Sequence, residues 1–72
     1  MSNSILITGK VIEPIPHGNF KVELDDGSVV LVKVSDELSK HLVRILPGDI
    51  VEIETPSYNF NKGKIIYNFT RL

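Results

Sequence analysis

The chain has 72 residues, a length that allows one small domain and leaves no room for a second, and its net charge is −1. It contains no cysteine, so a disulfide, a thiolate metal site and a cysteine nucleophile are excluded. The longest apolar run, Val29 to Val32, is too short to cross a membrane, and we expect neither a membrane segment nor a secretory signal. The many isoleucines and valines, with no alanine, favour sheet over helix, because β-branched side chains lose rotamer freedom in a helix.

Charge is unevenly distributed along the chain. Residues 1–54 hold five basic and nine acidic residues, whereas residues 55–72 hold three basic residues and no acidic one. A polyanion would therefore bind a local basic patch and would not be attracted by the net charge of the whole molecule.

The first predicted strand runs from Ile5 to Glu13, after a polar start over residues 1–4 that we expect to fray. Gly9 inside this strand indicates a bend or a close approach of two backbones. Pro14 and Pro16 are expected to end the pairing, so that residues 14–19 form a loop.

A β-hairpin is predicted next, from Asn19–Leu24 and Ser28–Val34. The Asp26-Gly27 pair between them is a strong turn signal, because glycine tolerates the positive φ of a tight turn. The alternation of both strands places one set of apolar side chains toward the core: Phe20, Val22, Leu24, Val30, Val32 and Val34.

The segment from Ser35 to Leu46 predicts a short helix with Ser35 as its N-cap. Leu38 and Leu42 have the i,i+4 spacing of one helix face. A turn at residues 47–49, a strand over Ile50–Thr55, a loop over Pro56–Gly63 and a last strand over Lys64–Phe69 complete the chain.

Three strands, a short helix and two more strands are the element order of an OB fold, a five-stranded barrel. The sequence therefore predicts an all-β OB-fold barrel over residues 1–72, with one helix between strands three and four. An SH3-like barrel is the rival all-β architecture, but it does not usually place a helix there.

Three segments carry a resemblance to a known family: Phe20–Gly27 (FKVELDDG), Arg44–Asp49 (RILPGD), and Tyr58 followed by Asn61–Ile65 (NKGKI). The chain resembles bacterial-type translation initiation factor one, without gaps, from about Ile5 to Tyr67. The resemblance implies an RNA-binding OB fold that occupies the decoding (A) site of the small ribosomal subunit. There it would contact ribosomal RNA, block premature entry of transfer RNA and act with the other initiation factors.

The resemblance also implies a setting: the cytoplasm of a bacterium, or the interior of an organelle derived from one. We expect a monomer that is not an enzyme and carries no cofactor.

Matched position by position, the resemblance implies RNA contact at Lys21, Lys40, Arg44, Tyr58, Lys62, Gly63 and Lys64. His17, a loop residue, and Arg71, in the acid-free basic segment, are expected to lie near RNA. Lys10 and Lys33 match no family contact and are expected to serve as non-binding controls. The chain departs from the family at Asn68, which stands where a basic residue is usual.

Other readings of these residues stay open. Arg44 would also suit the C-terminal end of a helix, paired with Asp36 or Glu37. Tyr58 would stack on a base or pack in its loop, and Phe60 is expected to pack.

Two other functional classes are considered. A general single-strand RNA binder or RNA-chaperone OB-fold protein would need aromatic side chains on strands two and three. The outward positions there are instead Lys21, Glu23, Leu31 and Lys33, which argues against that class. The excess of acidic over basic residues in residues 1–54 supports a protein-binding OB module instead.

Catalysis and metal binding have little support in the sequence. The two histidines, His17 and His41, lie far apart and lack the spacing of a metal site. No Ser-His-acid combination or glycine-rich phosphate loop appears, so we expect neither a catalytic residue nor a metal.

Overall fold

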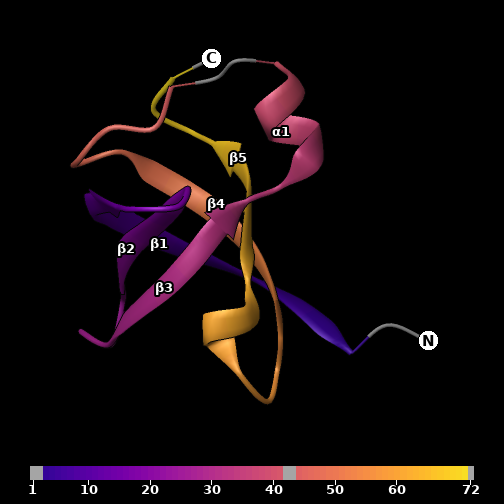
Figure 1. Cartoon of the computed structure of the whole chain (residues 1–72). Coiled ribbons are helices and arrows are strands. Elements are labelled where there is room, and N and C mark those ends of the chain that lie inside the picture. Colours follow the sequence, from indigo (N-terminus) through magenta and orange to yellow (C-terminus); the bar gives the residue numbers. More distant parts are fainter. Residues whose placement is uncertain (1–2, 42–43, 72) are drawn as a thin grey trace.

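Five strands close into a barrel in the order β1-β2-β3-β5-β4 in the computed structural model, which describes residues 3–41 and 44–71 (Figure 1). The elements are β1 (Ser4–Ile15), β2 (Asn19–Leu24), β3 (Val29–Val34), α1 (Asp36–Lys40), β4 (Ile50–Pro56), the short 3₁₀ helix η1 (Phe60–Lys62) and β5 (Lys64–Asn68). The predicted five-stranded barrel with a helix between strands three and four is confirmed. None of the described helices has the length and apolar character needed to cross a bilayer.

β1 is the longest strand because it pairs with two neighbours. Its first part pairs with β4 from Ser4 to Lys10, and its second part pairs with β2 from Gly9 to Ile15. A bulge between Val11 and Glu13 bends the strand and closes the barrel. A Cβ added to Gly9 would clash with Val22 of β2, so the predicted close approach at this glycine is confirmed.

The expectation that Pro14 ends the first strand is wrong. Pro14 pairs with Phe20, and Ile15 pairs with Asn19. β4 has already separated from β1 after Lys10, so this part of β1 has a strand on one side only. A proline is tolerated at such an edge, because no partner there needs its missing N–H.

α1 is shorter than the predicted helix and ends at Lys40. Its predicted N-cap is confirmed, since Ser35 Oγ accepts a 3.1 Å hydrogen bond from the Leu38 N–H. The Leu46 N–H donates to Asp49 Oδ2 at 3.0 Å and so takes part in a turn instead of a helix. Leu42, which is expected to share a helix face with Leu38, lies outside the described residues. Residues 1 and 2, part of the segment that is expected to fray, also lie outside them.

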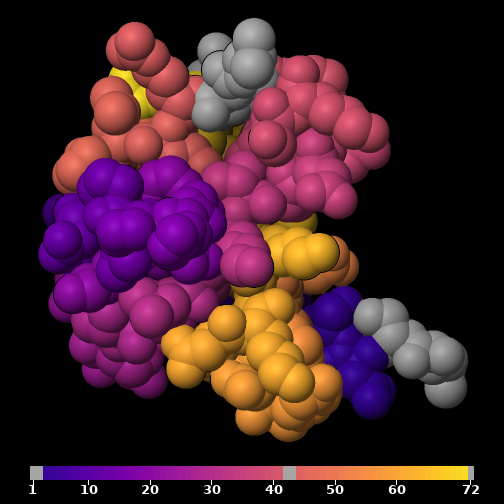
Figure 2. All heavy atoms as spheres, in the orientation of Figure 1, coloured from indigo at the N-terminus to yellow at the C-terminus, as the bar shows by residue number. Residues whose placement is uncertain are grey.

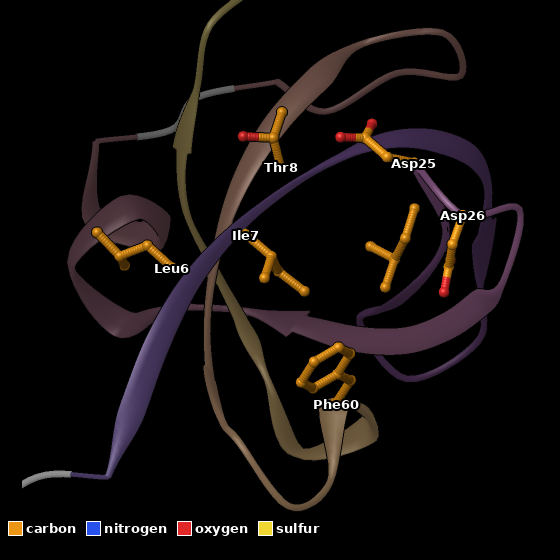
Figure 3. Close-up of a pocket in the computed structure, with 7 residues that line it drawn as sticks. Leu6, Ile7, Thr8, Asp25, Asp26 and Phe60 are labelled. Carbon is orange, nitrogen blue, oxygen red and sulfur yellow. The ribbon is translucent and has the colours of Figure 1, made fainter.

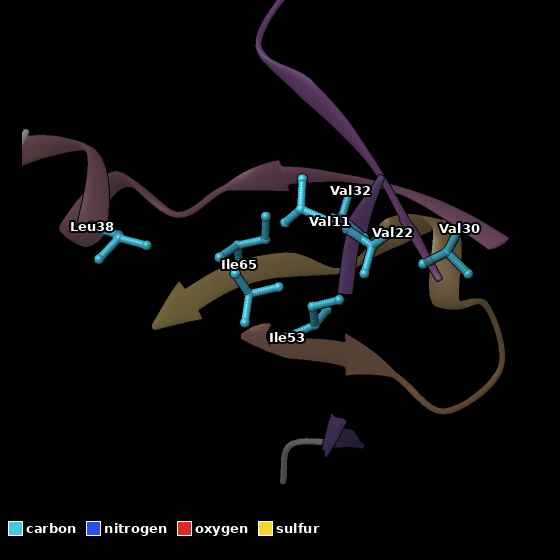
Figure 4. Packing of buried hydrophobic residues seen from close by; sticks show 8 residues of the cluster. Val11, Val22, Val30, Val32, Leu38, Ile53 and Ile65 are labelled. Carbon is cyan, nitrogen blue, oxygen red and sulfur yellow. The ribbon is translucent and has the colours of Figure 1, made fainter. Parts of the chain in front are cut away.

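The core consists almost entirely of β-branched side chains, as the composition favours (Figure 4). The buried residues are Val11, Val22, Val30, Val32, Leu38, Val51, Ile53 and Ile65. Leu38 of α1 covers one end of this cluster and Val30 lies toward the other (Figure 4). Three further side chains of the predicted alternation pack against it half-buried: Phe20, Leu24 and Val34.

Candidate nucleic-acid interface

A groove of about 380 Å³ on the outside of the barrel brings three lysines together. It is lined by Asn19 of β2, Leu31 and Lys33 of β3, Asn61 and Lys62 of η1, and Gly63 and Lys64 at the start of β5. Figure 2 shows the orange segment that contains η1 beside the magenta surface of β3. Because no carboxylate lines the groove, its lysines are suited to an anion.

The strand register explains why these side chains meet. Lys33 pairs with Asn19 across the β2–β3 ladder and with Lys64 across the parallel β3–β5 ladder. Val32 and Ile65 point into the core, so the lysines that alternate with them point outward. Lys33, expected from the sequence to be a control outside the site, therefore belongs to the groove.

A hydrogen bond ties η1 to β3. The Leu31 N–H donates to Asn61 Oδ1 at 3.0 Å, and the Asn61 N–H donates to Asn59 Oδ1 at 3.0 Å. Leu31 has a strand partner on its β2 side only, so the first bond satisfies a backbone donor on the other side of β3, and the second caps η1. Together they hold Lys62 against the edge of β3.

Gly63 contributes its backbone and its small size. A Cβ added there would lie 2.8 Å from Ile53 Cγ2 and 2.9 Å from Thr55 Cβ. The Gly63 carbonyl accepts a 3.4 Å hydrogen bond from the Lys33 N–H. Gly63 thus lets the chain enter β5 in close contact with β4, which positions the lysine on either side of it.

Tyr58 is the most exposed aromatic side chain of the described residues, at 73%. Lys62 Nζ lies over its ring, 5.7 Å from the centroid. Phe60, by contrast, is half-buried and packs against the core, as predicted. The Tyr58 ring is therefore open to a ligand, with a cation on one face.

Lys21 lies on the same outer surface of the sheet and forms an ion pair with a carboxylate. It pairs with Leu31 on β3, and its Nζ lies 3.6 Å from Glu13 Oε1. Both side chains are substantially exposed, so this ion pair is weak and leaves the ammonium accessible.

α1, which ends at Lys40, lies at the other end of the barrel from η1 (Figure 1), and the Arg44 carbonyl accepts a hydrogen bond from Asn68 at the C-terminal end of β5. β3 and β5 are parallel; α1 follows β3, whereas η1 precedes β5. Lys40 and Arg44 are exposed, and Arg44 forms no ion pair with Asp36 or Glu37. The structure therefore separates the expected contact residues into two regions, one at each end of this strand pair.

His17 lies in the β1–β2 turn, exposed and with a φ of 72°. Arg71 follows β5 and donates from Nε to Asp49 Oδ2 at 2.8 Å. The Asp49 carboxylate is 2% exposed. Arg71 thus neutralises a buried charge, while its side chain remains partly exposed.

A buried polar network around Asp49 was not expected from the sequence. Asp49 Oδ2 also accepts hydrogen bonds from the Asn68 side chain and the Leu46 N–H, each at 3.0 Å. Burial raises the pKa of Asp49, but the hydrogen bonds from Asn68, Leu46 and Arg71 outweigh it and hold the pKa below its ordinary value. The available signal is at Asp49, which lies just before β4 and continues the inward alternation of Val51 and Ile53, whereas Asn68 is the last residue of β5.

A second cavity, of about 430 Å³, opens at the barrel mouth (Figure 3). Its lining residues are Leu6, Ile7, Thr8, Leu24, Asp25, Asp26 and Phe60. The side-chain and backbone hydrogen bonds from Ser28 hold the pKa of Asp26 below its ordinary value, so this rim is negatively charged. The negative charge makes this rim less suited to phosphate than the lysine groove is.

Residues 3–41 and 44–71 do not form a metal-binding site. No three histidine, aspartate or glutamate side chains among these residues come together to hold a metal ion. A cavity of about 510 Å³ between α1 and β5 mixes Glu37, His41 and Arg71 with apolar side chains. The lysine groove is thus the described site best suited to a polyanion.

Comparison with known proteins identifies the family of the chain. The family model described as translation initiation factor 1A / IF-1 matches residues 4–72. The solution structure of translation initiation factor one from the Wolbachia endosymbiont strain TRS of Brugia malayi has a TM-score of 0.76 and 29% sequence identity, and the match covers 92% of this chain and 78% of that one. The resemblance read from the sequence is confirmed: the chain belongs to the translation initiation factor 1A / IF-1 family, whose members are OB-fold translation factors.

Proposed function

We propose that this initiation factor binds the small ribosomal subunit at the decoding (A) site through contacts to ribosomal RNA. In this position it blocks premature entry of transfer RNA and acts together with the other initiation factors. The observation that carries RNA binding is the groove in which Lys33, Lys62 and Lys64 meet without a carboxylate. Lysine ammonium groups bind backbone phosphates and release condensed counterions, which supplies most of the affinity.

Two regions of the molecule take part. The groove and the exposed Tyr58 ring lie at the η1 end, and Lys40 and Arg44 lie at the α1 end. A ligand that contacts both ends must extend along the β3–β5 side of the barrel, as a folded RNA surface can. The net charge of −1 favours such local contacts over attraction by the whole molecule.

A general single-strand RNA binder is the alternative function. Such proteins stack successive bases on aromatic side chains of the sheet. Here the outer positions of β2 and β3 carry Lys21, Glu23, Leu31 and Lys33, and no aromatic residue lines the groove. A structured ribosomal target therefore fits this surface better.

The proposed setting follows from the likeness to a bacterial factor. We place the protein in a bacterial cytoplasm or inside an organelle of bacterial origin, as a monomer without a cofactor or a catalytic step. Its role is then to occupy a site on the ribosome.

Co-sedimentation with purified small subunits tests this function. We expect saturable binding at one site that excess bulk RNA does not compete away. The logarithm of affinity should fall with the logarithm of salt concentration with a slope of about −3 to −5, given about −0.9 per phosphate contact. Binding that bulk RNA removes would favour the general RNA binder, and a slope near −10 would require far more contacts than this surface offers.

A further inference from the structure

We infer that Lys33 and Lys64 act as a pair that clamps a single phosphate of the RNA backbone, with Lys62 beside them. The inference rests on the proposed RNA-binding function and names the atoms of the groove that recognise the ligand. It also assigns a role to Lys33, for which the family resemblance implies none.

The register of the sheet places the two lysines side by side on one groove. Lys33 and Lys64 are Cα partners on the parallel strands β3 and β5. Adjacent strands lie about 4.8 Å apart, so both stems leave the same outer surface at neighbouring points. Like charges at facing positions of a sheet repel each other, and an anion held between them removes this repulsion.

No carboxylate of the protein takes the place of that anion. Within residues 3–41 and 44–71 the ion pairs join Lys21 to Glu13 and Arg71 to Asp49, and neither includes Lys33 or Lys64. Glu54 faces Lys64 from β4, but its Oε2 accepts a 3.3 Å hydrogen bond from Ser4 and it forms no ion pair with Lys64.

The rest of the groove suits a phosphodiester. The amide side chains of Asn19 and Asn61 line it together with the lysines, and they add neutral polar groups without negative charge. Asn61 accepts the Leu31 N–H through Oδ1, and the geometry of η1 keeps the following residue, Lys62, at the rim. A phosphate is compact, anionic and repeated along RNA, and lysines bind it as point charges.

Small-subunit binding at several salt concentrations tests the pair. The variants are Lys33→Gln, Lys64→Gln and the double variant, and Lys10→Gln is the control, an exposed lysine on β1 with the same charge change. Each single groove variant should weaken binding several-fold, and the double variant should lose less than the product of the two losses. The salt slope of the double variant should fall by about one in total, because one phosphate contact is lost.

Several results would overturn the inference and leave the function standing. If Lys33→Gln behaves like Lys10→Gln while Lys64→Gln binds weakly, Lys33 has no part in the site. If the double variant lowers the slope by about two, the lysines contact separate phosphates. The proposed function itself fails if the unmodified protein does not bind small subunits, or if bulk RNA competes that binding away.

A measurement without ribosomes judges the pair independently. Inorganic phosphate, added at constant ionic strength, should raise the melting temperature of the unmodified protein and of Lys10→Gln more than that of the double variant. The comparison between variants is needed because phosphate also stabilises proteins by exclusion from their surface. Equal shifts in all three proteins would overturn the inference.

Discussion

Asn68 Nδ2 donates a 3.0 Å hydrogen bond to Asp49 Oδ2 inside the barrel, where the two residues are 1% and 2% exposed. The same amide donates at 3.0 Å to the carbonyl of Arg44, and its Oδ1 accepts the N–H groups of Thr70 and Arg71. Asn68 thus joins the segment that carries Arg44, the start of β4 and the end of the chain. A neutral amide suits this buried position, because a charged side chain there would need an ion-pair partner to offset the cost of its burial.

Replacing Asn68 by alanine should destabilise the protein. The variant leaves the buried Asp49 carboxylate and the Arg44 carbonyl each without one donor, at a cost of about 2–3 kcal/mol in total. For a domain of this size that lowers the melting temperature by on the order of 10 °C. Thermal unfolding measures the change, with the exposed Ser39→Ala on α1 as control, expected within about 0.5 kcal/mol of the unmodified protein. An unchanged melting temperature would show that water replaces the amide without loss.

The network also predicts how stability depends on pH. The pKa of Asp49 is lower in the folded state than its ordinary value of about 3.9. Its ionised form therefore stabilises the fold above about pH 4, and that stabilisation is lost as the pH falls through the folded pKa. Denaturant unfolding between pH 6 and pH 2 should show that the free energy gap between the unmodified protein and Asp49→Asn shrinks in acid. A gap that is constant across this range would contradict the assignment.

Local patterns were sufficient to predict most of the fold. The hairpin of β2 and β3 follows from strict alternation and the Asp26-Gly27 turn, and Gly27 has the expected positive φ of 86°. The end of β1 was missed because the effect of Pro14 depends on which edge of the strand is paired. That pairing is set by the closure of the barrel, which sequence neighbours do not reveal.

The candidate site was predictable only in part, for a similar reason. Lys62 and Lys64 are close in sequence, so their grouping needs no knowledge of the fold. Lys33 joins them through the parallel β3–β5 ladder, which links residues 31 positions apart. The buried roles of Asp49 and Asn68 depend on the same kind of long-range pairing.

Gly63→Ala should lower stability through overpacking. The new methyl group would lie 2.8 Å from Ile53 Cγ2 and 2.9 Å from Thr55 Cβ, both part of the rigid β4 wall. Forcing such a group into a packed interior costs about 1–3 kcal/mol. Urea unfolding gives the loss, and small-subunit binding well below the melting temperature should be largely retained. Normal stability with lost binding would mean instead that the Gly63 backbone contacts RNA directly.

Arg44→Ala and Lys64→Ala should each weaken small-subunit binding, although the residues lie at opposite ends of the barrel. Both side chains are exposed, so neither change should alter the melting temperature by more than a few degrees. Each loss of a phosphate contact lowers the salt slope by about one. Lys10→Ala carries the same charge change and should bind normally. If it binds as weakly as the other two, the attraction is diffuse and the two proposed contact regions are wrong.

Tyr58 should contribute to binding through its ring rather than its hydroxyl. Its side chain is 73% exposed, and one face carries the Lys62 ammonium at 5.7 Å, which leaves the rest of the ring free to stack on a base. Stacking on an aromatic ring contributes about 1–3 kcal/mol per base. Tyr58→Ala should therefore raise the dissociation constant for small subunits at least about fivefold, whereas Tyr58→Phe retains the ring and should bind normally. Both variants should melt like the unmodified protein, because so exposed a side chain adds little to the core. Equal weakening by phenylalanine and alanine would assign the contact to the hydroxyl, and unchanged binding in both would remove Tyr58 from the interface.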